Sequence, residues 1–194
     1  MKLFIYGAGG AGLEVYDLVM RNNQFKKRYS VVYFIDDFQE ETEYYGTMRL
    51  HFASCGAYIG QEEAEFVIAV GEPSARRFLF EKIKSFGYVL TTLIDERAII
   101  SNTAKISEGC VINAGTIVSS NAVIEKNCFI MFDVIIGHDA IIHSHSVISP
   151  KAMIGGHCFV GEECFVGLGS SIIQERKIGN KVIIGMGAAL FSDR

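Results

Sequence analysis

The second half of the chain carries an aliphatic residue at every sixth position. From Ile94 to Leu190 this position is Ile, Val or Leu seventeen times in succession, without an insertion or a deletion. Two positions before each of these residues the side chain is nearly always small, and Arg176 is the exception. Residues two apart in an extended segment point to the same side. Both columns are therefore predicted to face inward.

A chain that turns after every short extended segment is typical of a β-helix. We predict three hexads per coil, which gives between five and six coils that rise about 4.8 Å each. The pattern also explains why 19 of the 24 isoleucines lie in residues 94–194. Four of the five cysteines, Cys110, Cys128, Cys158 and Cys164, occupy the column of small residues. They are predicted to be compact core side chains rather than nucleophiles or metal ligands.

The first half follows a different pattern, in which short apolar runs alternate with stretches of helical periodicity. Strands are predicted over 2–6, 31–35, 66–70 and 88–93, and helices over 13–20 and 75–86. The stretch 39–65 is polar and has no clear period. This order predicts a small, Rossmann-like α/β domain over residues 1–93, with a parallel sheet of about four strands, followed by the β-helix over 94–194.

Composition and charge exclude several classes of protein. Apolar residues make up 49% of the 194 residues, which excludes a disordered chain, and no apolar window is long enough to span a membrane. The formal net charge is −4, spread evenly over both halves, so no basic surface for nucleic acid is expected. Five cysteines without CxxC spacing favour reduced thiols and a cytoplasmic location.

A glycine-rich loop, Gly7–Gly12, follows the first predicted strand and precedes the first predicted helix. Backbone N–H groups of such a loop, together with the N-terminus of the helix, can hold a pyrophosphate. By itself the loop is as compatible with a nicotinamide dinucleotide as with a sugar nucleotide.

The isoleucine-rich hexad repeat resembles the left-handed β-helix of bacterial acyltransferases. Together with the glycine loop and Asp36-Asp37-Phe38, the whole chain is similar to the sugar-nucleotide acetyltransferases of the bacillosamine, perosamine and sialic-acid pathways. The resemblance implies left-handed coils, a homotrimer with active sites between subunits, and acetyl-coenzyme A as co-substrate. It implies N-acetylation of an amino-sugar nucleotide, expected to be a UDP-4-amino sugar, without a metal.

Gly137-His138-Asp139 is the most specific part of the resemblance, because this group of enzymes has a histidine followed by an acidic residue at this point of the coil. An imidazole can take the proton that the acceptor loses as it attacks the thioester, and a carboxylate can orient it. His138 is thus the expected general base, exposed at a corner, with Asp139 beside it. The repeat offers no activated Ser or Cys, so direct attack by the acceptor is favoured over an acyl-enzyme.

The resemblance also assigns binding residues. Those for the nucleotide sugar are Gly9, Gly10, Ala11, Asp36, Asp37, Phe38 and Gly71, and those for coenzyme A are Val147, Gly156, Leu168, Met186 and Gly187. The chain departs from the pattern of the group at three positions. Ala11 and Val147 stand where histidines are common, and Met131 stands where an asparagine is common.

Three other functions remain compatible with the sequence. One is O-acetylation of a sugar or sialic acid. Another is a metal-dependent β-helical carbonic anhydrase, since the spacing of His138 and His143 resembles part of its ligand pattern. A third is a scaffold that binds nucleotide sugars without turnover. His143 and His145 are otherwise expected at exposed turns.

Overall fold

The computed structural model describes residues 1–60 and 63–191. These residues form two compact units, one made of Met1–Val70 and Phe78–Thr91 and the other of Gly71–Arg77 and Thr92 onward. The sequence placed the boundary after residue 93 and assigned 71–77 to the first domain, whereas this segment belongs with the second unit. Residues 192–194, part of the predicted second domain, lie outside the described residues.

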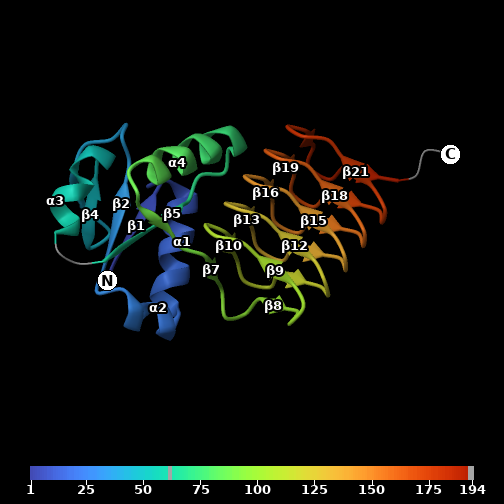
Figure 1. Ribbon diagram of the computed structural model, residues 1–194, viewed down its shortest axis with the longest axis horizontal. Coiled ribbons are helices and arrows are strands. Elements are labelled where there is room, and N and C mark those ends of the chain that lie inside the picture. The colour runs from blue at the N-terminus through green and yellow to red at the C-terminus, as the bar shows by residue number, and fades with distance from the viewer. Residues whose placement is uncertain (61–62, 192–194) are drawn as a thin grey trace. The chain divides into compact units, whose positions relative to one another are not determined.

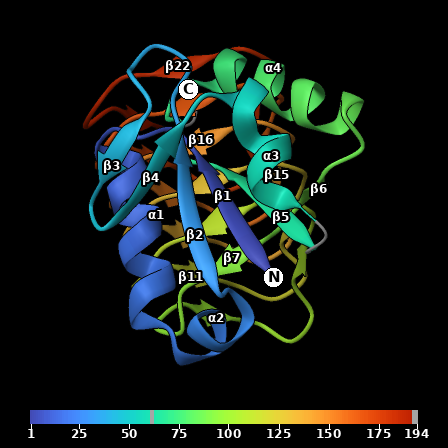
Figure 2. The same ribbon diagram turned by 90° about the vertical axis from the view of Figure 1, so that its left-hand side faces the viewer.

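The first unit contains a mixed six-stranded sheet in the order β3-β4-β2-β1-β5-β6 (Figures 1 and 2). Its strands are β1 (Lys2–Tyr6), β2 (Val31–Ile35), β3 (Thr42–Tyr44), β4 (Thr47–Leu50), β5 (Ala64–Ile68) and β6 (Val89–Leu90). Its helices are α1 (Gly10–Arg21), α2 (Asn23–Arg28), a 3-10 turn (Phe52–Ser54), α3 (Cys55–Ile59) and most of α4 (Pro73–Ser85). Every neighbouring pair is parallel except β3 and β4.

The predicted strands over 2–6 and 31–35 are confirmed residue for residue. The expected total of about four strands is wrong, because the stretch 39–65 adds the antiparallel hairpin of β3 and β4. Its two-residue turn, Tyr45-Gly46, has positive φ at both positions. This geometry is usually signalled by Asn-Gly or Asp-Gly, so a Tyr-Gly turn gave no recognisable signal. The strand predicted over 88–93 is limited to β6, because the second unit resumes at Thr92 and Leu93 belongs to the next strand.

The second unit is a left-handed parallel β-helix of seventeen two-residue strands (Figure 1). The strands are β7 (Leu93–Ile94), β8 (Ile99–Ile100), β9 (Lys105–Ile106), β10 (Val111–Ile112), β11 (Ile117–Val118), β12 (Val123–Ile124), β13 (Phe129–Ile130), β14 (Ile135–Ile136), β15 (Ile141–Ile142), β16 (Val147–Ile148), β17 (Met153–Ile154), β18 (Phe159–Val160), β19 (Phe165–Val166), β20 (Ser171–Ile172), β21 (Lys177–Ile178), β22 (Ile183–Ile184) and β23 (Ala189–Leu190). The second residue of every strand is the predicted aliphatic position, so the hexad register is confirmed.

Three parallel sheets form the faces of this β-helix. We call them the β7 sheet, the β8 sheet and the β9 sheet after their first strands, and they hold six, six and five strands. Neighbours within a sheet are 18 residues apart, as in the pairing of Ile112 with Ile130. One coil therefore comprises three hexads, as predicted.

The interior of the β-helix is a single hydrophobic cluster built from the two inward columns. Each of the four cysteines of the small-residue column is at most 1% exposed. Their predicted role as core side chains is confirmed. Arg176, the exception in that column, is partly buried and its Nε atom has no hydrogen-bond partner.

The turns between the sheets are equally regular. Fourteen of them, spaced six residues apart from Gly109 to Gly187, place one residue in the left-handed region of φ. Asp139 and His157 occupy this position in consecutive coils, with φ of 57° and 56°. Their backbones are thus held in the same conformation, one coil apart. None of the described helices combines the length and the hydrophobicity that a membrane span requires.

Candidate active site at a corner of the β-helix

His138 lies in the turn that leads from β14 in the β8 sheet to β15 in the β9 sheet. Its side chain is 59% exposed, as predicted for a corner position. The turn is held in place because Gly137 N donates to Ile154 O and Asp139 N donates to Ser120 O. The imidazole is therefore presented to solvent from a rigid backbone.

Asp139 orients this imidazole. Its Oδ2 lies 2.8 Å from His138 Nδ1, and its Oδ1 accepts a hydrogen bond of 3.1 Å from Asn121 Nδ2. The hydrogen bond from His138, and then that from Asn121, lowers the pKa of Asp139 below its ordinary value. An ionised carboxylate can only accept hydrogen bonds, so His138 Nδ1 must donate. The lone pair of His138 Nε2 is then free to accept a proton.

Gly156 lies directly beneath the His138 ring. A Cβ atom on Gly156 would lie 2.7 Å from His138 Nε2 and 2.9 Å from Cε1, both closer than real contacts allow. Only glycine therefore leaves the imidazole in its place.

We expect Gly156→Ala to lower kcat of the reaction proposed below by about 10- to 100-fold, because the displaced imidazole would no longer meet the acceptor at the right position. Steady-state kinetics checks this. The matched control is Gly179→Ala, whose Cβ would meet open space. Equal activity of the two variants would show that the ring position over Gly156 is unimportant.

His157 also lies at this corner, although the sequence pattern gave it no role there. Its Nε2 lies 3.8 Å from Asp139 Oδ2, and its ring stands edge-on to that of His138 with the ring centroids 5.0 Å apart. The difference between positions 157 and 139 is 18, one full coil. The hexad register therefore contained the signal that these two residues stack.

The glycine loop has two kinds of glycine. Gly7 and Gly12 are required by packing, because a Cβ on Gly7 would lie 2.6 Å from Ala69 O and one on Gly12 would lie 2.0 Å from Gly7 O. Gly9 and Gly10 are exposed, and a Cβ on either would meet nothing within 4 Å. Gly9 precedes the first residue of α1. The open part of the loop thus coincides with the helix N-terminus, where an anionic group is favoured.

Asp36, Asp37 and Phe38 follow β2 at the carboxyl edge of the sheet. Asp36 Oδ1 accepts from Phe38 N at 3.0 Å, and the Phe38 side chain is 96% exposed. Asp37 has protein partners on both oxygens. Phe52 N donates to Oδ1 at 2.7 Å, while Lys82 Nζ, at 2.8 Å, and the Tyr6 hydroxyl donate to Oδ2.

We expect the Asp37–Lys82 ion pair to make a pH-dependent contribution to the free energy of unfolding. Burial raises the pKa of Asp37, but the bonds from Lys82, Tyr6 and Phe52 outweigh it and lower the pKa below the ordinary value of 3.8. A lowered folded-state pKa stabilises the fold above the unfolded-state pKa, and this stability is lost as the pH falls through the folded value.

Lys82→Met should therefore cost up to about 1 kcal/mol at pH 7, and this difference from the wild type should shrink below about pH 4. Urea unfolding of both proteins across this range measures it. A difference that is independent of pH would contradict the coupling.

Residues 2–83 match the family described as the PglD N-terminal domain, and residues 121–156 match the bacterial transferase hexapeptide family. Among solved structures, the acetyltransferase domain of PglB from Neisseria gonorrhoeae is 27% identical, with a TM-score of 0.90 over 99% of this chain and 92% of that one. The chain combines a PglD-type N-terminal domain with the bacterial transferase hexapeptide repeat. A search of curated proteins found no significant match.

Two further similar structures contain bound ligands. The same PglB domain in complex with acetyl-coenzyme A is 26% identical, with a TM-score of 0.87 over 97% of this chain and 92% of that one. Perosamine N-acetyltransferase from Caulobacter crescentus, PerB, in complex with coenzyme A and GDP-perosamine is 22% identical, with a TM-score of 0.89 over 100% of this chain and 90% of that one. The second likeness concerns the fold alone.

The residues that the acyltransferase resemblance assigned to coenzyme A lie at different places in the β-helix. Gly156 is beneath His138. Leu168 and Met186, 47% and 78% exposed, lie one coil apart at a different corner, in the turns that lead from the β7 sheet to the β8 sheet, and Gly187 follows Met186. Val147 is fully buried, so its side chain is not accessible to coenzyme A.

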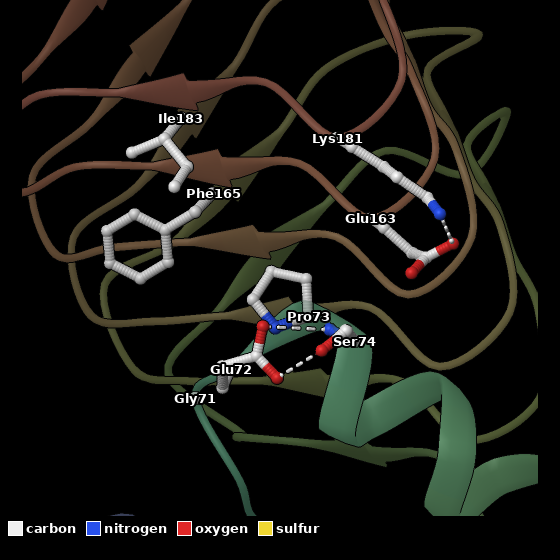
Figure 3. Close-up of a pocket in the computed structure, with 8 residues that line it drawn as sticks. All are labelled: Gly71, Glu72, Pro73, Ser74, Glu163, Phe165, Lys181 and Ile183. Carbon is white, nitrogen blue, oxygen red and sulfur yellow. Dashed lines mark hydrogen bonds and ion pairs between the residues drawn. The ribbon is translucent and has the colours of Figure 1, made fainter.

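Gly71, assigned to the nucleotide sugar, belongs to the second unit, whereas the other six assigned residues belong to the first. It borders a pocket of about 310 Å³ at the start of α4 (Figure 3). In this pocket Lys181 Nζ lies 3.8 Å from Glu163, and the Glu72 carboxylate accepts hydrogen bonds from Ser74 and Ala75. The helix N-terminus is thus already capped by a carboxylate.

The remaining histidines differ from the expectation of exposed turns, because both are partly buried. His143 packs on the Phe159 ring, and its Nδ1 lies 3.0 Å from Glu125 Oε2. His145 Nδ1 lies 3.0 Å from Asn127 Nδ2. Among the described residues, the possible metal ligands that gather are His138, Asp139 and His157. His143, which the carbonic anhydrase hypothesis paired with His138, is not among them.

Proposed function

We propose that this acyltransferase moves the acetyl group of acetyl-coenzyme A to the amino group of a nucleotide-linked amino sugar, a UDP-4-amino sugar. The observation that carries the proposal is the exposed His138 imidazole, whose Nδ1 is hydrogen-bonded to the ionised Asp139 and whose Nε2 lone pair is free. This is the arrangement that a general base requires.

His138 takes part in a single displacement. The acceptor nitrogen attacks the thioester carbonyl carbon, the bond from that carbon to sulfur breaks, and His138 Nε2 takes the proton that the nitrogen loses. Asp139 stabilises the imidazolium so formed. The proton then passes to the leaving thiolate, which returns His138 to its neutral form. The buried cysteines of the interior are unsuited to an acyl-enzyme, which supports direct attack.

We assign the pantetheine arm of coenzyme A to an apolar pocket of about 350 Å³ on the outer face of the β8 sheet. Ile135, Met153 and Ile173, which are 37–49% exposed, line it together with Gly137 and Gly155. The two glycines immediately precede His138 and Gly156 in the chain. An arm lying here would bring the thioester toward the base.

The positions of the assigned residues support a site shared between subunits. Leu168 and Met186 lie on one corner of the β-helix and His138 on another. The resemblance implies a homotrimer of parallel β-helices, in which such corners of two adjacent subunits together contact one coenzyme A. The sugar nucleotide is assigned to the open glycines of the loop, with its pyrophosphate at the N-terminus of α1.

The experiment is to incubate the protein with acetyl-coenzyme A and a panel of UDP-, GDP- and dTDP-linked amino and hydroxy sugars, and to follow thiol release. Mass spectrometry and NMR of the product then distinguish an acetamido from an O-acetyl group. Amide formation on a UDP-4-amino sugar supports the proposal. An ester product, or binding of nucleotide sugars without any thiol release, would favour the O-acetyltransferase or the scaffold.

A further inference from the structure

His138, Asp139 and His157 bring two imidazoles and a carboxylate together at one exposed corner. One ligand atom from each of the three lies within 4.8 Å of the other two. Two imidazoles and a carboxylate are a donor set that Zn²⁺ prefers. For a tetrahedral zinc ion the donor atoms are separated by about 3.3–3.5 Å, given metal–ligand distances near 2.1 Å. The separations of 2.8 Å and 3.8 Å around Asp139 Oδ2 bracket this value.

The backbone and a neighbouring side chain hold this arrangement. Asp139 and His157 occupy equivalent left-handed turn positions in consecutive coils, and His157 N donates to His138 O at 2.9 Å. Asn121 donates to Asp139 Oδ1, which leaves Oδ2 directed toward both imidazoles. Such support of a ligating carboxylate by an outer hydrogen bond is a regular feature of metal sites.

The site is also open to a metal. The side chains of His138 and His157 are 59% and 56% exposed, and that of Asp139 is 36% exposed. The Asp139 carboxylate supplies an oxygen ligand beside the two imidazole nitrogens. A fourth position remains for water, as in zinc sites that have three protein ligands.

We propose that His138, Asp139 and His157 form a binding site for Zn²⁺ that switches off the general base. A neutral imidazole that binds a metal through one nitrogen carries its hydrogen on the other. Whichever nitrogen of His138 coordinates, no lone pair is left to accept the proton of the acceptor. The ion competes with the function of His138 and takes no part in acetyl transfer. The blocking effect rests on the proposed function, whereas binding of the metal does not.

The first arm of the test measures binding alone. Untagged, chelator-treated protein is titrated with Co²⁺, followed by the visible absorption of the bound ion, and with Zn²⁺ by calorimetry. We expect one ion per chain. His157→Asn, a residue that accepts the left-handed turn, should bind about 100-fold or more weakly, since even outer-shell changes cost 10- to 100-fold. The control His51→Gln alters a histidine of the first unit and should bind as the wild type does.

The second arm measures acetyl transfer with and without Zn²⁺. Free coenzyme A binds zinc through its thiol, so the acetylated sugar is quantified by mass spectrometry at initial rates. Each protein is compared with its own rate in the absence of zinc. Zinc should lower the rates of the wild type and of His51→Gln, whereas the rate of His157→Asn should be the same with and without zinc. Binding by wild type that is no tighter than by His157→Asn would overturn the site. Zinc inhibition that persists in His157→Asn would overturn the blocking role. If no acetyl transfer occurs at all, the proposed function fails, while the binding arm still decides the metal site.

Discussion

His138→Ala is expected to lower kcat for acetyl transfer by about 10²- to 10⁴-fold, the range that a positioned general base contributes. The loss should fall on kcat, because the variant lacks the group that takes the proton in the transition state. Steady-state kinetics with acetyl-coenzyme A and the amino-sugar nucleotide checks this expectation. Since the side chain is largely exposed and Asp139 is its hydrogen-bond partner, the midpoint of thermal unfolding should change little.

Asp139→Asn provides a graded comparison with this variant. The amide can still contact Asn121, but it carries no charge to stabilise an imidazolium, so we expect a smaller loss than in His138→Ala. His51→Ala serves as the control for removal of a partly exposed histidine elsewhere. Near-normal turnover by a folded His138→Ala would contradict the assignment of the base.

Arg76→Met is expected to destabilise the second unit by about 3 kcal/mol, because it leaves two buried acceptors without their donor. Arg76 is fully buried. Its Nε donates to Asn127 O at 2.9 Å, and its Nη2 donates to Asn127 Oδ1 at 2.7 Å. Burial lowers the pKa of Arg76 to about 10, so part of the loss is offset by relief of that desolvation. Thermal unfolding should show a decrease of roughly 6–12 °C.

The adjacent Arg77 offers a matched control for this prediction. Its side chain is 45% exposed and lies 2.7 Å from Glu163, which also has Lys181 Nζ at 3.8 Å. Glu163 is only 6% exposed but keeps Lys181 as a partner, so Arg77→Met should cost less than Arg76→Met. Equal destabilisation by the two substitutions would show that the buried bonds to Asn127 contribute nothing of their own.

The site was partly predictable for a physical reason. His138 follows an inward isoleucine by two positions, so its exposure at a corner and its contact with Asp139 could be inferred from one hexad alone. The hydrogen bond from Asn121 and the approach of His157 depend on stacking of three coils. The hexad register shows which turn residues stack, but only once one coil is known to comprise three hexads.

Other features of the fold depend on contacts between residues far apart in the chain, which no local sequence pattern predicts. The Tyr45-Gly46 turn lacks the usual hairpin residues, so the edge strands β3 and β4 were missed. Asp37 stands in a motif that suggests a ligand contact, but whether its oxygens have protein partners depends on Lys82, 45 residues away. Likewise, only the packing of Gly71–Arg77 with the β-helix assigns that segment to the second unit.

The order of apolar and small residues alone was sufficient to establish the β-helix, its coil length and its interior. In a repeat of period six, each hexad makes the same contacts with the hexad eighteen residues further along the chain. The local pattern of inward residues therefore also determines which strands pair. Tertiary structure decided which side chains meet at the surface. The residues at the turns vary from coil to coil, so the cluster of His138, Asp139 and His157 exists only because two turns, stacked one coil apart, carry compatible groups.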